Sequence, residues 1–298
     1  MANKDLVRMA DDIIKSAEIA EVSYSREVIE KVLHIYEKNF SHSLVPVTFR
    51  TTTKKLEKRG LNIRYVDFWT PHDPHAIAIS NGLIAKQGHP IDNLFEEIQA
   101  NYPVMGYGID FGVLTGFEKI WPFFAPHIPQ PVQKAYAMKS LPDSVKKNSD
   151  FFTKFNLDNF ALFAIDYHNR STNIYFMTSS IGKFSSEKIA AIIKELDFAT
   201  PSQELIDYCT NAITFYCTYT WDSPKIERIC FGVLAQDQST IPTHLNPLIE
   251  KYSLNAPILS ENRKFIYSIT FARQGDYIKI ENDYSGSMVD LMHMGSPA

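Results

Sequence analysis

Residues 159–179 read NFALFAIDYHNRSTNIYFMTS and contain the clearest β-hairpin pattern in the chain. Asn159–Asp166 is an apolar run with a polar residue at each end. In Asn173–Ser179 one face would carry Asn173, Tyr175, Met177 and Ser179 and the other Ile174 and Phe176, and His168-Asn169-Arg170 separates the two runs. Alternation with a period of two is typical of half-buried strands, and a short polar segment between two such runs predicts a turn. We therefore expect an antiparallel hairpin over these residues.

The same unit occurs five times along the chain. The predicted hairpins cover residues 47–66, 104–124, 159–179, 212–234 and 265–283, and they begin 57, 55, 53 and 53 residues apart. Apolar stripes with helical spacing precede the first hairpin, at residues 6–14 and 28–36, and lie between the hairpins, at residues 73–82, 92–100, 142–154, 185–196 and 244–252. A fixed interval of this kind is the mark of an internally repeated architecture.

The repeats predict an α+β fold in which five αββα units form a ten-stranded antiparallel β-barrel with a ring of helices outside. Ten strands are too many to remain comfortably in one open twisted sheet, and closure removes the exposed edges. A barrel of this size is wide enough to hold a cavity. No stretch rich in Pro, Gly or Ser divides the chain, so residues 1–298 are expected to form a single domain.

Composition restricts the possible partners and location. The net charge of −4 argues against a general nucleic-acid surface, and no run reaches the roughly 18 apolar residues of a membrane helix. Three cysteines, Cys209, Cys217 and Cys230, match no zinc spacing and make an odd count. We expect reduced thiols in a cytoplasmic monomer that binds neither nucleic acid nor membrane.

Cationic side chains lie beside aromatic ones on the strand faces that would line the barrel. The apolar faces would pack against the helices, and the inner wall would then hold Arg50, Arg64, Lys119, Arg228 and Lys279, with Asn173, Tyr175 and Tyr216 nearby. Buried like charges are costly without an anion, and Arg and Lys suit the oxygens of a diphosphate. Aromatic faces stabilise a cation by about 0.5–2 kcal/mol, so an allylic carbocation would fit beside them. The alternative is five ordinary hairpins with polar residues in solvent.

Several sequence blocks carry a resemblance to a known family. They are Gly88-His89-Pro90-Ile91-Asp92, Thr115-Gly116-Phe117-Glu118-Lys119, Asp166-Tyr167, Asn173-Ile174-Tyr175-Phe176, and Trp221 followed by residues 225–231. In this order and at these intervals they resemble the soluble aromatic prenyltransferases of the ABBA (PT-barrel) type, in the phenol- and phenazine-modifying branch. The resemblance covers nearly the whole chain.

The resemblance implies an enzyme of secondary metabolism that moves a dimethylallyl group, or alternatively a geranyl group, from its diphosphate onto a small aromatic acceptor. Hydroxynaphthalenes, phenolic acids and phenazines are the expected acceptors, and the reaction is electrophilic aromatic substitution. It further implies that Lys119, Asn173, Tyr216, Arg228 and Lys279 hold the diphosphate. Tyr175 and Trp121 would flank the prenyl chain and the acceptor.

One departure from the family pattern concerns magnesium. Members that need Mg²⁺ carry an aspartate on the second strand, and Asn62 stands at that position here. An amide is a poor Mg²⁺ anchor, and Arg64 on the same strand face can take the charge role, as can Arg50. We predict turnover without magnesium or any other cofactor, and we add Arg50, Asn62 and Arg64 to the expected diphosphate site. Asn169 replaces a lysine that meets the diphosphate in some members.

Glu281 and Asp283 are the candidate bases for the final proton loss, and a salt bridge with Lys279 or a neighbour is the alternative role for each. Tyr175 is expected to shield the allyl cation during catalysis. Asp110 is expected to be a structural, hydrogen-bonded carboxylate. The pocket for the prenyl chain and the acceptor is expected to contain Trp121, Ala161, Phe163, Tyr175, Ile213, Gly232 and Ile266.

Two other functions stay open from the residues alone. A non-catalytic barrel could bind a hydrophobic anion without turnover, and a structural or interaction protein could share the fold. A prenyl-transfer assay separates these alternatives from the enzyme.

Overall fold

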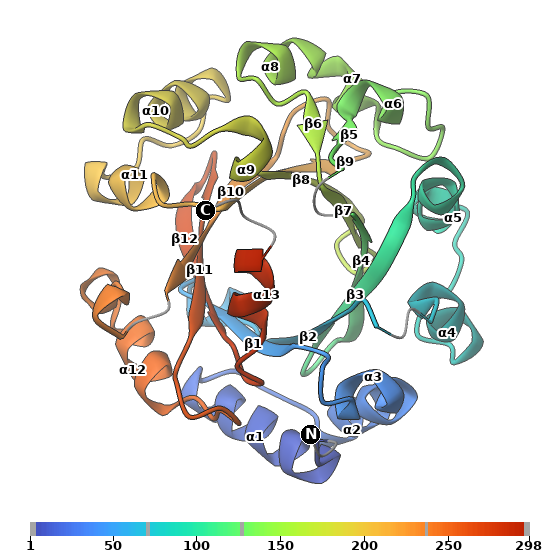
Figure 1. The fold of residues 1–298 in the computed structure, drawn as a ribbon, viewed down its shortest axis with the longest axis vertical. Coiled ribbons are helices and arrows are strands. Elements are labelled where there is room, and N and C mark those ends of the chain that lie inside the picture. The colour runs from blue at the N-terminus through green and yellow to red at the C-terminus, as the bar shows by residue number, and fades with distance from the viewer. Residues whose placement is uncertain (1–3, 70–71, 126–127, 236–237, 295–298) are drawn as a thin grey trace.

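Ten antiparallel strands form a closed barrel in the computed structural model, which describes residues 4–69, 72–125, 128–235 and 238–294 (Figure 1). Around the barrel the order is β1-β12-β11-β10-β9-β8-β7-β4-β3-β2, so the predicted ten-stranded barrel is confirmed. The strands are β1 Val47–Thr52, β2 Asn62–Asp67, β3 Val104–Gly112, β4 Gly116–Phe124, β7 Leu162–Asp166, β8 Ser171–Met177, β9 Thr214–Thr220, β10 Arg228–Ala235, β11 Phe265–Ala272 and β12 Gly275–Asn282.

Helices surround the barrel, as Figure 1 shows. They are α1 Leu6–Ile19, α2 Arg26–Ile35, α3 Glu37–Ser41, α4 Pro74–Ser80, α5 Ile91–Asn101, α6 Val132–Ala135, α7 Asp143–Lys147, α8 Ser149–Lys154, α9 Thr178–Ile181, α10 Ser186–Glu195, α11 Gln203–Cys209 and α12 Pro247–Asn255. Polar caps start several of them: Asp5 caps α1, Ser25 caps α2 and Ser185 caps α10, each by accepting backbone N–H bonds in the first turn. In the described part of the chain, no helix combines the length and the apolar character that crossing a bilayer requires.

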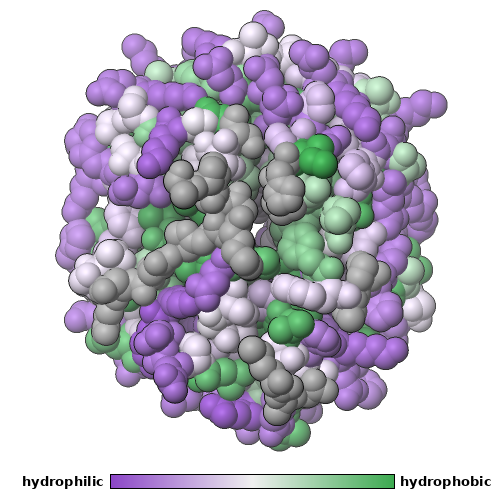
Figure 2. Space-filling model, viewed as in Figure 1, coloured by the Kyte–Doolittle hydropathy of each residue, from purple (hydrophilic) through white to green (hydrophobic). Residues whose placement is uncertain are grey.

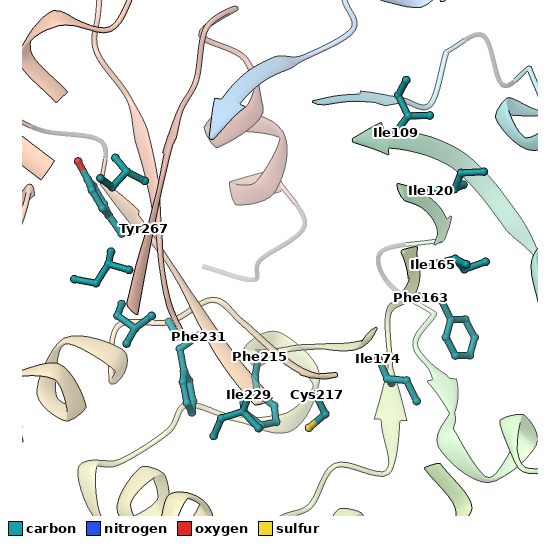
Figure 3. Packing of buried hydrophobic residues seen from close by; sticks show 14 of the residues in the cluster. Ile109, Ile120, Phe163, Ile165, Ile174, Phe215, Cys217, Ile229, Phe231 and Tyr267 are labelled. Atoms are coloured by element: carbon teal, nitrogen blue, oxygen red, sulfur yellow. The ribbon is translucent and has the colours of Figure 1, made fainter. Parts of the chain in front are cut away.

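The main hydrophobic core lies between the strands and the helices. Apolar side chains from the outer strand faces, such as Ile109, Ile174, Phe215 and Phe231, point away from the barrel centre and are fully buried (Figure 3). Because alternate residues of a strand point to opposite faces, packing these residues outward directs their neighbours into the lumen. The core therefore fixes which side chains can meet a ligand.

One predicted strand is divided, and the pairing of β3 with β4 is irregular. The predicted strand over residues 159–166 is divided, because Asn159–Phe160 forms β6, which pairs with β5 (Gln130–Pro131) outside the barrel, whereas β7 begins at Leu162. A register shift between Asp110 and Phe111 marks an irregularity opposite β4. It turns Phe117 outward, where its ring stacks on Tyr36 at 6.0 Å, so Phe117 does not share the inner face of Lys119 and Trp121.

The last described helix, α13 (Met288–Met294), lies within the ring of strands in Figure 1. Its Met288 and Val289 pack with Val66 and Ile266 from the barrel wall. On the face shown in Figure 2, hydrophobic side chains gather toward the middle and hydrophilic ones dominate the periphery. The helix thus supplies an apolar cover at one end of the lumen.

Candidate functional site

The lumen encloses a cavity of about 200 Å³ that runs from charged residues to apolar ones. Its wall carries the charged side chains of Arg50, Arg64, Lys279 and Glu281 and the rings of Trp121, Tyr175 and Tyr216. At the α13 end the wall is apolar and consists of Val66, Phe68, Phe123, Ile266, Met288, Leu291 and Met292. An amphiphilic molecule with an anionic head fits this gradient.

Three of the five predicted cations have carboxylate partners inside the barrel. Asp110 Oδ2 lies 2.8 Å from Arg50 Nη2 and 3.3 Å from Arg64 Nη2. Lys119 Nζ lies 3.1 Å from Asp166 Oδ2. These pairs correct the argument that all five cations need an external anion, because the protein itself compensates Arg50, Arg64 and Lys119.

The register of the strands predicts that Asp110 and Asp166 face the lumen. Asp110 lies opposite Arg64 on β2 and opposite Lys119 on β4, and Asp166 also lies opposite Lys119. Directly opposed residues of antiparallel strands share a face, so inward cations place these carboxylates inward too. The expectation that Asp110 is structural agrees with its contacts.

Arg228 and Lys279 lack such compensation. Within the described ranges, neither has an ion-pair partner; instead the Arg228 Nε–H donates to Thr218 Oγ1 at 3.2 Å, and Lys279 donates to the Tyr216 hydroxyl. Burial lowers the pKa of Lys279, and the positive charges of Arg50 and Arg228 add to this effect. A buried cation without a carboxylate is a ready site for an anionic ligand.

Asn173 is linked to Arg228 through the hydroxyl group of Thr218. Thr218 Oγ1–H donates to Asn173 Oδ1 at 2.7 Å, and Thr218 also accepts from Arg228. The amide nitrogen of Asn173 lies 3.5 Å from the Tyr175 hydroxyl. The structure therefore brings Asn173, Tyr216, Arg228 and Lys279 to neighbouring positions of β8, β9, β10 and β12.

Aromatic rings adjoin the cations. The centre of the Trp121 ring lies 4.6 Å from the Arg64 guanidinium carbon, and the centres of the Tyr175 and Tyr216 rings lie 4.3 Å apart. The Trp121 Nε1–H points to the Tyr175 hydroxyl at 3.5 Å. These rings lie on the wall of the same cavity as Arg50, Arg64 and Lys279.

Glu281 lies on the cavity wall and has two partners. Thr48 Oγ1–H donates to Glu281 Oε1 at 2.6 Å, and Arg64 Nη1 lies 2.9 Å from Oε2. Burial raises the pKa of Glu281 to about 7, although Arg50 and the Thr48 hydrogen bond oppose the rise. A carboxyl group with this pKa can accept a proton near neutral pH.

Asp283 has a different environment. Its carboxylate accepts backbone N–H bonds from Gly286 and Val289, each at 2.9 Å, and thereby anchors the segment that begins α13. Burial raises its pKa to about 6. Because both oxygens are occupied by backbone donors, this position favours a structural role over that of a base.

The predicted pocket residues lie in different places. Trp121, Ala161, Tyr175 and Ile266 line the cavity. Gly232 faces the lumen between Thr214 and Ser268, since a Cβ there would meet Thr214 Oγ1.

Phe163 and Ile213 do not lie where the sequence analysis placed them. Phe163 packs outward against Phe160 and Phe124, because strand alternation gives the inner positions to Leu162 and Ala164, so its assignment to the pocket is wrong. Thr214, rather than Ile213, lines the cavity on β9.

Asn62 binds a carboxylate that the sequence analysis overlooked. Its amide donates to Glu118 Oε2 at 2.7 Å, and Thr115 Oγ1–H donates to Glu118 Oε1 at 2.6 Å. The irregular β3–β4 pairing places Glu118 here, and alternation alone cannot predict such a change of face. In the described part of the chain, no three His, Cys, Asp or Glu residues are arranged to hold a metal ion.

The chain was also compared with known proteins. The model of the aromatic prenyltransferase Orf2 family matches residues 4–294. The chain belongs to this family. It is 33% identical to 5,10-dihydrophenazine-1-carboxylate 9-dimethylallyltransferase of Streptomyces anulatus, over 93% of this chain and 92% of the relative. It is 31% identical to the furaquinocin biosynthesis prenyltransferase of Streptomyces sp. (strain KO-3988), over 97% of this chain and 93% of the relative.

A solved structure supports the fold of this aromatic prenyltransferase. The 5-dimethylallyl tryptophan synthase from Streptomyces coelicolor, in complex with DMASPP and Trp, has a TM-score of 0.63 at 7% identity and covers 97% of each chain. The family resemblance seen in the sequence blocks and the expected enzyme class are confirmed. The roles of individual residues stay predictions.

Proposed function

We propose that this prenyltransferase moves a dimethylallyl group from dimethylallyl diphosphate onto a small fused or phenolic aromatic ring, such as a hydroxynaphthalene, a phenolic acid or a phenazine, with geranyl as the longer donor. The observation that carries the proposal is the single cavity that joins the uncompensated Lys279 to an aromatic belt and an apolar end. The acceptor class is supported by relatives named for a dihydrophenazine carboxylate, for furaquinocin biosynthesis and for flaviolin.

The donor binds with its diphosphate at Lys279, Arg228, Asn173 and Tyr216. Lys119, Arg50, Arg64 and Asn62 form the adjoining wall, where Asp110, Asp166 and Glu118 hold them in place. When the carbon–oxygen bond breaks, the diphosphate takes the electron pair, and fixed cations stabilise its growing charge. Lys279 and Arg228 contribute most, since neither forms an ion pair with a carboxylate among the residues that the structure describes.

The allyl cation forms beside Trp121, Tyr175 and Tyr216. Their faces stabilise positive charge and exclude water, which would otherwise capture the cation. The acceptor ring lies toward the apolar end, near Ala161, Gly232 and Ile266, where it is held close to the reacting carbon. A carbon of the ring attacks the cation, and the new carbon–carbon bond leaves an arenium ion.

Glu281 takes the proton that the arenium ion loses. It lines the cavity, and its pKa of about 7 allows both protonation states near neutral pH. Arg64 holds the carboxylate toward the lumen. Rearomatisation then releases the prenylated product and a protonated Glu281, which returns its proton to water.

Turnover requires no magnesium in this proposal. The Asn62 amide is committed to Glu118, and the guanidinium groups of Arg50 and Arg64 lie on the neighbouring strands. One chain is sufficient, because a single barrel supplies the cavity residues. The three cysteines are buried thiols, which fits a reducing compartment such as the cytoplasm.

A prenyl-transfer assay tests the proposal. Dimethylallyl diphosphate is incubated with each acceptor class in the presence of EDTA, and products are identified by mass. We expect a product one prenyl unit heavier with at least one acceptor, and none with Lys279→Met. Binding of dimethylallyl diphosphate without product from any acceptor would instead support the non-catalytic barrel.

A further inference from the structure

The charged residues of the lumen are distributed unevenly around the barrel. On the arc from β1 to β7, Arg50, Arg64 and Lys119 have carboxylate partners. On the arc from β9 to β12, Arg228 and Lys279 contact hydroxyl groups instead. A ligand anion therefore gains most by binding to the β9–β12 arc, and other residues of that arc are candidates for the same site.

Tyr277 lies on this arc. It is on the inner face of β12, two residues before Lys279 and opposite Thr270 of β11. Lys279 Nζ lies 5.9 Å from the centre of the Tyr277 ring. The Tyr277 side chain is half-buried and belongs to the same strand face as Lys279, at the end of β12 that adjoins the hairpin turn.

Lys54 lies over the same ring. It is in the loop between β1 and β2, and its Nζ is 4.3 Å from the centre of the Tyr277 ring. Thr53 holds the loop there, because its backbone N–H donates to Ile278 O at 2.8 Å and its Oγ1 accepts from the Ile278 N–H at 2.9 Å. Like Arg228 and Lys279, Lys54 has no ion-pair partner among the residues that the structure describes.

Three cations thus act on one phenol. Burial alone would raise the pKa of Tyr277, but the charges of Lys279, Arg228 and Lys54 lower it to about 8. An acidic hydroxyl among cations is a strong hydrogen-bond donor to phosphate oxygen. A packing role would not require three cations around one ring that lack ion-pair partners among the described residues.

We propose that Tyr277 and Lys54 complete the diphosphate site: Tyr277 donates its O–H to a phosphate oxygen, and Lys54 supplies positive charge from the hairpin-turn side. This inference rests on the proposed function and extends it to two residues that the sequence analysis did not assign. The site then spans Lys54, Arg228, Tyr277 and Lys279, with Tyr216 toward the cavity.

Calorimetric binding of inorganic pyrophosphate tests the assignment in the full-length protein. We expect Tyr277→Phe to weaken binding about tenfold, since a hydrogen bond to a charged group is lost. Lys54→Met should weaken it about threefold, as is typical for a half-exposed charge. Lys55→Met is the matched control, because Lys55 belongs to the same loop and is exposed; it should bind like the wild type. Equal affinity for all four proteins overturns the proposal.

Ultraviolet absorbance of tyrosinate gives a second readout that does not depend on activity. The groups acting on Tyr277 are Lys279, Arg228, Lys54, Cys230 and Tyr216. The wild type should show one phenol that ionises near pH 8, and Tyr277→Phe should lack it. Pyrophosphate should shift this step to higher pH, because the bound anion disfavours the phenolate. If pyrophosphate does not change the pH at which this phenol ionises, Tyr277 lies outside the site.

The two proposals fail in different ways. If the wild type binds pyrophosphate and forms product while both variants match Lys55→Met, only the assignment of Tyr277 and Lys54 is wrong. If the wild type binds no pyrophosphate and forms no product with any acceptor, the proposed prenyl transfer is wrong as well.

Discussion

Arg64 Nη1 lies 2.9 Å from Glu281 Oε2, although the two residues belong to β2 and β12 and β1 lies between them. The guanidinium reaches across one strand and also contacts Trp121 and Asp110. One side chain therefore connects the proposed base, the aromatic belt and the paired carboxylate. Substitution of Arg64 should therefore change the environment of Glu281 directly.

Glu281→Gln should lower kcat about 100-fold, because a positioned general base contributes at least that much. The base must be deprotonated, so wild-type kcat should rise as pH increases through about 7, and the glutamine variant should lose this rise. A pH–rate profile at saturating donor and acceptor measures both effects. Glu57→Gln, on the exposed β1–β2 loop, serves as the control. A variant that keeps the wild-type profile shows that another group takes the proton.

Lys279→Met and Lys119→Met should have opposite effects on stability. Removing Lys279 relieves a buried cation without a carboxylate, so the free energy of unfolding of the ligand-free protein should rise by about 1 kcal/mol. Removing Lys119 leaves the buried Asp166 carboxylate without its cationic partner and should lower the free energy of unfolding by about 3 kcal/mol.

Urea denaturation without ligand measures these two values, and activity assays should find both variants strongly impaired. Equal stability changes would show that Lys279 is compensated in solution and would weaken its assignment as the main anion site.

Asp283→Ala should destabilise the protein by about 2 kcal/mol, because the buried Val289 N–H and the part-buried Gly286 N–H lose their acceptor. Thermal unfolding measures the effect. Asp290→Ala in α13 is the control: its partner is Lys264 in a largely exposed pair, and the change should stay below about 1 kcal/mol. If Asp283→Ala abolishes product formation but leaves the unfolding temperature unchanged, Asp283 is a base rather than a helix anchor.

Metal removal should leave the rate within about twofold, because cationic side chains occupy the charge role of Mg²⁺. Asn62→Asp should replace the amide bond to Glu118 with two adjacent carboxylates, which repel each other and lower stability by about 1–2 kcal/mol. Added Mg²⁺ should restore part of the lost stability of Asn62→Asp and should leave the stability of the wild type unchanged. Wild-type activity that disappears with EDTA and returns with magnesium contradicts the prediction.

Strand periodicity predicted the barrel and most of its inner wall. Arg50, Arg64, Lys119, Arg228 and Lys279 all lie on inner faces, because packing apolar residues against the helices fixes the opposite face. Phe163 was misplaced because an aromatic residue in a strand was assigned to the pocket against the alternation of its own strand. Its neighbours Leu162 and Ala164 hold the inner positions.

The remaining parts of the site depend on the irregular β3–β4 pairing and on which residues face each other across neighbouring strands. The β3–β4 register shift that turns Phe117 outward and brings Glu118 to Asn62 has no periodic signature. Asp110 and Asp166 appear unremarkable until strand register places them opposite cations. The cover formed by α13 was not predicted, although Met288, Leu291 and Met292 have the i, i+3, i+4 spacing of one helical face.

The pairing of β1 with β12 has a consequence for folding. Every other contact in the barrel joins strands that follow one another among the barrel strands, whereas this seam joins Phe49 to Asn282 and Thr52 to Lys279. Contacts between such distant parts of the chain are entropically expensive to close and therefore form late. Lys279 and Glu281 lie on β12, which follows the other nine barrel strands in the chain, so the seam and the reaction chamber become complete in the same late step.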